Sequence, residues 1–196
     1  NRVKDFVKDN NNGIIKVSIP DSLTSIRQFL VNGCHMIDLL NYITPGLKIT
    51  YKKCIFDAEN NIESLVAVGE CEDKWQVIIE SKPSAPDNFE ICSSANKQVY
   101  KLRPIEILEV FDDMNIIEPT DDIPIRRYVP KLREKIVEKA DFKPGFIDQA
   151  KAFMKFCKYK EKTRGITTFD QSLETLNICH YLIQDNNLSY EDFINL

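Results

Sequence analysis

The sequence predicts an α+β domain in which helices pack on one face of a large, mostly antiparallel sheet. Between residues 47 and 103 the apolar side chains recur with a period of about two, and before and after that region they recur with a helical period. The consecutive strand-like segments are joined by short polar turns, which favour hairpins over parallel crossovers. At 196 residues the chain is long enough to bury a core of its own.

The first segments alternate between helix and strand. Residues 1–12 have the apolar spacing of a helix. Residues 14–19 have the composition of a strand, which Pro20 closes. Residues 30–43 fit a helix with Asn32 as its N-cap.

Further along the chain the sequence pattern changes from strand-like to irregular and then to helical. Five segments are expected to be strands: 47–56, 62–71, 75–80, 89–93 and 98–103. Residues 104–130 are punctuated by prolines and are expected to form a long irregular connection. Three helices are expected to follow, near residues 146–157, after a capping box at 168–171, and from Ser189.

Composition argues against several classes of protein. The chain carries 26 Lys and Arg against 30 Asp and Glu, so nucleic acid is not an expected partner. No stretch reaches the roughly 20 apolar residues of a membrane helix, and we expect a cytoplasmic protein with no membrane partner. Six scattered cysteines, two distant histidines and no CxxC pair predict reduced thiols and no metal site. No two of the six glycines form a GxG pair, so the chain itself lacks a dinucleotide fingerprint.

His35 and Asp38 are the candidate catalytic residues. On the expected helix His35 lies in the first turn, where the helix dipole favours a neutral imidazole that can accept a proton. A core histidine is the alternative. Asp38 follows one turn later and would orient the imidazole through a hydrogen bond, or would serve helix packing or capping instead.

The candidate substrate-binding residues are Asn32, Arg126, Arg127 and Tyr128. Asn32 is first an N-cap and second a possible substrate contact. The other three lie in the proline-rich connection and offer donors suited to a diphosphate or a carboxylate. Ordinary salt bridges are the alternative for the arginines.

Two further residues have mainly structural interpretations. Trp75 lies in an alternating strand and is expected to pack in the core or on a sheet face. His180 lies on the apolar stripe of the last long helix and is expected to be buried or at an interface.

Three segments carry a resemblance to a known family. The run Gly-Cys-His-Met-Ile-Asp-Leu-Leu at 33–40 resembles the G-x-H-x-I-D-L-L stretch of the Gfo/Idh/MocA oxidoreductases. Residues 89–91 with 100–102 resemble a strand pair of that family, and residues 146–156 with 167–173 resemble its closing helices. The resemblance spans roughly residues 13–184.

The resemblance implies the C-terminal, substrate-side domain of an NAD(P)-dependent enzyme acting on a sugar or nucleotide sugar. NAD or NADP would be bound mainly by an N-terminal Rossmann domain absent from this chain, so the chain alone would be inactive. Residues 1–12 would be the end of a linker or helix from that domain, and residues 13–196 the substrate-binding and oligomerisation domain. The family also implies a homodimer or tetramer that pairs through the sheet face.

One departure from the family pattern supports a second interpretation. Many members carry Asp four residues before the histidine, whereas this chain has Val31 there and Asn32 beside it. The alternative is a non-catalytic ligand-sensing or scaffold domain derived from the same family.

Overall fold

The computed structural model describes residues 2–20, 25–71, 74–81, 87–138, 145–160 and 166–184. The helices are α1 (Arg2–Asp9), α2 (Ile26–Gln28), α3 (Cys34–Ile43), α4 (Phe146–Tyr159) and α5 (Phe169–Ile183), with a π-helical turn, η1 (Phe29–Gly33), between α2 and α3. The strands are β1 (Gly13–Ile19), β2 (Lys48–Phe56), β3 (Ile62–Glu70), β4 (Trp75–Ser81), β5 (Glu90–Ala95), β6 (Gln98–Leu102), β7 (Ile107–Ile117) and β8 (Arg127–Val137).

The described strands form one sheet in the order β2-β3-β4-β1-β5-β6-β7-β8. All neighbouring pairs are antiparallel except β1 and β4, which run parallel. That pair is parallel because the chain leaves β1, passes through the helical segment and the β2–β3 hairpin, and returns beside β1 as a crossover. The predicted α+β class and the mostly antiparallel sheet are confirmed.

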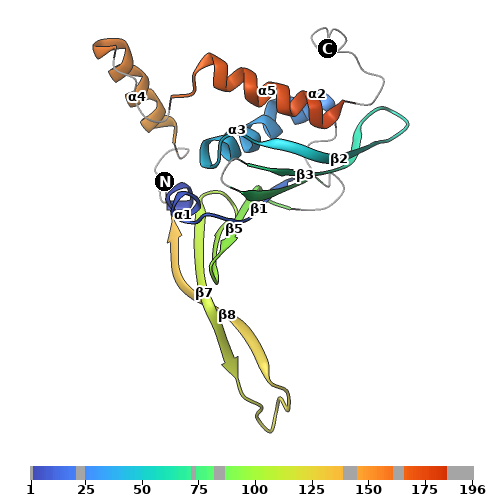
Figure 1. Ribbon diagram of the computed structural model, residues 1–196, viewed down its shortest axis with the longest axis vertical. Coiled ribbons are helices and arrows are strands. Elements are labelled where there is room, and N and C mark those ends of the chain that lie inside the picture. The colour runs from blue at the N-terminus through green and yellow to red at the C-terminus, as the bar shows by residue number, and fades with distance from the viewer. Residues whose placement is uncertain are drawn as a thin grey trace.

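The core lies between one face of the sheet and the helices that cover it (Figure 1). Trp75 is fully buried in that core, and its indole N–H donates to the Asn10 carbonyl oxygen at 3.1 Å. Phe6 of α1 stacks on Tyr100 with ring centroids 4.2 Å apart and meets Trp75 edge-on at 6.0 Å. Helix α1 therefore packs on the middle of the sheet, and the prediction of a core role for Trp75 is confirmed.

The expected irregular connection at 104–130 is wrong. Strands β7 and β8 form a long hairpin there, with the loop between them at residues 118–126. The prolines suggested an irregular connection, but each of those at 119, 124 and 130 lies where a hairpin tolerates a proline. Pro119 and Pro124 lie in the loop, and Pro130 lies in β8, the last strand of the sheet, where a missing N–H is tolerated.

The two closing helices form as expected, but their apolar faces are less buried than predicted. Helix α5 begins with the expected capping box, in which the Gln171 N–H donates to Thr168 Oγ1 at 3.3 Å. His180 is buried as predicted, whereas Leu173 and Leu176, which the helical spacing places on the same apolar stripe of α5, are exposed. None of the residues of α4, all of which are described, is buried. The helix expected from Ser189 lies outside the described residues.

Candidate active site

The helix that carries His35 begins earlier than predicted. Ser25 is its N-cap, and a capping box joins Ser25 to Gln28, whose N–H donates to Ser25 Oγ at 3.2 Å. From there α2, η1 and α3 follow without a break. Asn32 lies inside the π-helical turn, so its assignment as an N-cap is wrong. The sequence signal that could have located the helix start is the Ser-x-x-Gln spacing at 25–28.

The π-helical turn places His35 immediately after an irregular part of the helix. Such turns are rare and occur frequently at functional sites. His35 is the second residue of α3 and is exposed to solvent. The ring is therefore free of the apolar core, as a proton-transfer role requires. The core-histidine interpretation does not fit this position.

The electrostatic argument for His35 must be corrected. His35 lies well inside the continuous helical segment that starts after Ser25, not in its first turn. The helix dipole acts mainly on groups in the first and last turns. The predicted position of His35 in the first turn of its helix is therefore wrong.

Asp38 lies on the side of α3 that packs against α5. Thr175 Oγ1 donates to Asp38 Oδ1 at 3.4 Å, and Asn41 Nδ2 donates to Thr175 Oγ1 at the same distance. Among the described residues no hydrogen bond joins His35 to Asp38. The observed contacts of Asp38 are thus those expected of a residue that serves helix packing. Asp38 nevertheless lies one turn after His35, so the two side chains are neighbours on the helix surface.

Cys34 and Cys179 line the same helix contact. Cys34 Sγ donates to the Val31 carbonyl oxygen at 3.3 Å. Burial, with a smaller contribution from the Asp38 carboxylate, raises the pKa of the Cys34 thiol. Burial also raises the pKa of Cys179 strongly. Both thiols therefore stay protonated at neutral pH and are poor nucleophiles.

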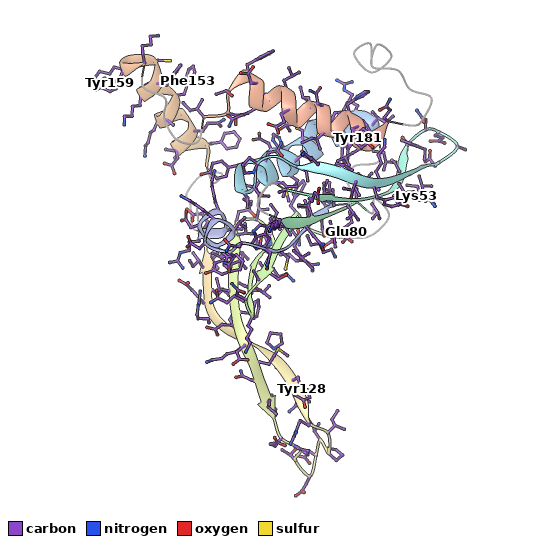
Figure 2. All side chains as sticks on the ribbon, viewed as in Figure 1. Lys53, Glu80, Tyr128, Phe153, Tyr159 and Tyr181 are labelled. Carbon is purple, nitrogen blue, oxygen red and sulfur yellow. The ribbon has the colours of Figure 1, made fainter. Side chains whose placement is uncertain are left out.

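The three residues predicted in the proline-rich segment lie far from α3. Arg126 is in the loop of the β7–β8 hairpin and pairs with Glu118 at 3.0 Å. Arg127 and Tyr128 begin β8. Figure 2 shows Tyr128 toward the distal end of this hairpin, well separated from α3 as labelled in Figure 1. The structure brings Asn32, His35 and Asp38 together on one helical segment but does not bring Arg126, Arg127 and Tyr128 to them.

Two hollows flank the helical layer. One, of about 500 Å³, lies between α5 and the start of β2 and is lined by residues such as Leu47, Leu173 and Tyr181. The other, of about 480 Å³, lies between α1, α3 and the strands β6 and β7, and includes Leu39 and Tyr42. His35 lines neither of them, and it is exposed to solvent in this chain.

The part of the chain that the structure describes has neither a metal-ligand cluster nor a membrane-spanning helix. No group of three or more His, Cys, Asp or Glu side chains there is arranged to hold a metal ion. No described helix has both the length and the apolar character to cross a bilayer.

Comparisons with known proteins give matches in structure only. No protein-family model matches the sequence, and no curated protein matches it. The chain is similar to a dehydrogenase (MviM) from Clostridium difficile, with a TM-score of 0.64, 11% identity, and coverage of 93% of this chain and 58% of that chain. It is also similar to the UDP-N-acetylglucosamine 3-dehydrogenase GnnA from Acidithiobacillus ferrooxidans, with a TM-score of 0.62, 6% identity, and coverage of 92% and 56%.

A third solved structure carries the family name in its description. It is a Gfo/Idh/MocA family oxidoreductase from Vibrio cholerae, with a TM-score of 0.52, 12% identity, and coverage of 88% of this chain and 50% of that chain. The chain thus spans between 50% and 58% of the length of these three proteins. It has the fold of part of a Gfo/Idh/MocA-type oxidoreductase, and the resemblance predicted from its sequence is confirmed at the level of the fold.

Proposed function

We propose that this chain is the substrate-side domain of an NAD(P)-dependent oxidoreductase that acts on a sugar or nucleotide sugar. The fold supports the oxidoreductase assignment, and the description of one structural neighbour as a UDP-N-acetylglucosamine 3-dehydrogenase supports the substrate class. The neighbours are longer than this chain, which supports a second domain in the whole protein that binds most of the cofactor. The chain alone would then be inactive.

The observation that carries the proposal is an exposed imidazole next to a π-helical turn, in the segment that resembles the family motif. A nicotinamide held mainly by polypeptide outside this chain would supply the hydride chemistry at a carbon of the substrate. His35 would take the proton from the substrate hydroxyl during oxidation and return it during reduction. Because the side chain is exposed, the pocket around it must be completed by polypeptide outside this chain.

The remaining residues of the proposed site support His35 from the same helical segment. Asn32, in the π-helical turn, would contact a substrate hydroxyl with its amide. Asp38 would hold α3 in position through Thr175 of α5, and would orient His35 once the pocket is complete. Arg126, Arg127 and Tyr128 are left out of this site because of their distance from α3.

The proposal includes a cytoplasmic homo-oligomer. One face of the sheet is covered by helices, and its other face exposes apolar side chains on β2 and β3, among them Tyr51, Val66 and Val68. Pairing of two copies through this face would bury them.

The test uses the longer protein that contains this chain. A panel of sugars and nucleotide sugars is assayed by nicotinamide absorbance, and His35→Ala is compared with the wild-type enzyme. We expect kcat to fall at least about a hundredfold, because a positioned acid–base group contributes about 10²–10⁴-fold, while affinity for the nicotinamide cofactor is unchanged. Asn177→Ala, at another exposed helical position, is the matched control and should keep full activity. Wild-type turnover in His35→Ala would rule out the proposed role.

A non-catalytic ligand-sensing or scaffold domain is the second candidate. The observation that favours it is Val31 at the position where many family members carry Asp. Its signature would be saturable binding of a nucleotide sugar by calorimetry with no nicotinamide oxidation or reduction in any member of the panel. An upstream sequence without a GxGxxG fingerprint and without an E-K-P motif would agree with that result.

A further inference from the structure

The hollow of about 480 Å³ between α1, α3 and the strands β6 and β7 has mostly apolar walls. We call it the α1–α3 hollow. Its apolar walls include the side chains of Val3, Leu39, Leu102, Ile105, Leu108 and Ile136. Sites for small molecules are concave, mostly apolar and about 300–1,000 Å³ in volume, with a few polar groups that fix the orientation of the ligand. The α1–α3 hollow therefore has the size and the lining of a site for a small apolar group.

One side of α3 leads from His35 to this hollow. A second side of the helix is buried in the core, and a third packs on α5. The remaining side carries His35, Leu39 and Tyr42, which follow one another at the i, i+4 and i+7 positions of the helix. Leu39 and Tyr42 line the hollow, about 6 Å and about 10 Å beyond His35 along the helix axis. A molecule that meets the His35 imidazole at one end can therefore reach the hollow with its other end.

The charges of the α1–α3 hollow balance among the described residues that line it. Its charged side chains are two basic and two acidic ones: Arg2, Lys4, Glu106 and Glu138. The Arg2 guanidinium pairs with Glu134 outside the hollow, and the Lys4 ammonium lies 3.9 Å from the centroid of the Tyr42 ring. A diphosphate is recognised by an excess of cationic donors, which these residues do not supply. The hollow instead suits an uncharged alkyl or aryl group, whose affinity comes from the burial of apolar surface.

The hollow also lies next to the segment expected to join this chain to the cofactor domain. Residues 1–12 are expected to be the end of a linker or helix from that domain, and Arg2 and Val3 of α1 line the hollow. Ligand sites form preferentially at the interfaces between domains. A second domain that completes the pocket around His35 would therefore leave the α1–α3 hollow as a branch of the same pocket.

We propose that the α1–α3 hollow is a specificity subsite for an apolar group linked to the substrate sugar. The reacting hydroxyl meets His35, and the alkyl or aryl group lies against Leu39, Tyr42 and Ile105. The inference rests on the proposed function for the reaction at His35. It narrows the substrate class to sugars that carry an apolar substituent, such as alkyl or aryl glycosides.

The test compares methyl and hexyl glycosides of the same sugars, using the longer protein that contains this chain. Binding is measured by calorimetry in the presence of the nicotinamide cofactor, and turnover is measured by nicotinamide absorbance. Ile105→Glu places a charge in the hollow. Ile123→Glu is the matched control, because both isoleucines are 38% exposed and Ile123 lies in the loop of the β7–β8 hairpin. Far-UV circular dichroism checks that each variant is folded.

We expect the wild-type protein to bind a hexyl glycoside at least about tenfold more tightly than the methyl glycoside, because each buried methylene group contributes about fourfold in affinity. Ile105→Glu should abolish this difference and raise KM for the hexyl glycoside, since a charge in the hollow opposes burial of the alkyl chain. Its kcat and its affinity for the methyl glycoside should be unchanged. Ile123→Glu should behave as the wild type. His35→Ala should lower the turnover of both glycosides and still bind the hexyl glycoside more tightly.

Three outcomes would overturn the subsite. Equal affinity of the wild-type protein for the two glycosides would do so, and turnover of the methyl glycoside would then leave the proposed function in place. A preference for the hexyl glycoside that survives in Ile105→Glu would place the apolar group elsewhere. A nucleotide sugar that binds more tightly than either glycoside, and that loses this affinity in Ile105→Glu, would assign the hollow to a nucleotide.

Failure of the proposed function has a different signature. In that case no sugar of the panel is turned over. Tighter binding of the hexyl glycoside that Ile105→Glu abolishes would still support the α1–α3 hollow as a binding site for an apolar group.

Discussion

Replacement of Gly13 by Ala tests how closely β1 packs between β4 and β5. A Cβ atom at this position would lie 2.4 Å from Cζ3 of Trp75 and 2.5 Å from the Ser94 carbonyl oxygen. Both distances are far below van der Waals contact. Neither neighbour can move freely, because Trp75 is fully buried and donates a hydrogen bond to the Asn10 carbonyl, and Ser94 belongs to a paired strand.

The magnitude follows from two opposing effects. Overpacking of a core costs about 1–3 kcal/mol, and the reduced freedom of the unfolded chain in a Gly→Ala change returns about 0.4–1 kcal/mol. Gly13 does not have a positive φ, so no backbone strain is added. The midpoints of these two ranges leave a net loss of about 1.3 kcal/mol, which lowers the Tm of a domain of this size by about 3–5 °C.

The assay is urea and thermal unfolding followed by the fluorescence of Trp75, the only tryptophan of the chain. Because the added methyl group presses on the indole, the emission of the folded state should change as well. Ile14→Ala is the matched control, since Ile14 is the next residue of β1 and its side chain is exposed on the uncovered face. Its loss should stay below about 1 kcal/mol. A Gly13→Ala protein with wild-type Tm and wild-type emission would refute the close packing of β1 against Trp75.

Two further predictions concern α5. Burial, together with the nearby Lys52 ammonium, lowers the pKa of His180, so the unfolded chain takes up a proton near pH 6.5 that the folded protein takes up only at lower pH. The free energy of unfolding should therefore fall as the pH drops below about 6.5. In the His180→Gln variant the Tm should depend less on pH in this range. An equal dependence of Tm on pH in the two proteins would contradict the lowered pKa of His180. Thr168→Ala removes the side-chain acceptor of the Gln171 N–H and should cost about 1 kcal/mol in urea unfolding. Ser172→Ala, one turn later on an exposed position, should change little, and equal losses in the two variants would argue against a capping role.

The elements predicted to within one or two residues of where they begin are those whose signal is local. The strands from 47 to 103 follow from alternation and turn residues, and α5 follows from its capping box and apolar spacing. A period of two and a hydrogen-bonded cap depend only on neighbours within a few residues, so the chain itself specifies them.

The helix that carries His35 was predicted in part for the same reason. The segment at 33–40 lies on a helix, as expected, and carries His35. The start of the helix was misplaced because Asn32 is a good cap by residue type, while the Ser25–Gln28 capping box lies further upstream. Both are plausible caps from sequence, and the tertiary structure adds the upstream turn, in which Phe29 is fully buried in the core.

The amino-acid sequence by itself determined the fold class, most of the strands, the buried tryptophan and the histidine on its helix, because periodicity and local hydrogen bonding set these. Only the tertiary structure decided which apolar side chains stay exposed, that the proline-rich segment becomes a projecting hairpin, and that its arginines lie far from His35. Those features depend on which strand lies at the edge of the sheet and on what covers each face. They are contacts between residues distant in the chain, which a local pattern does not specify.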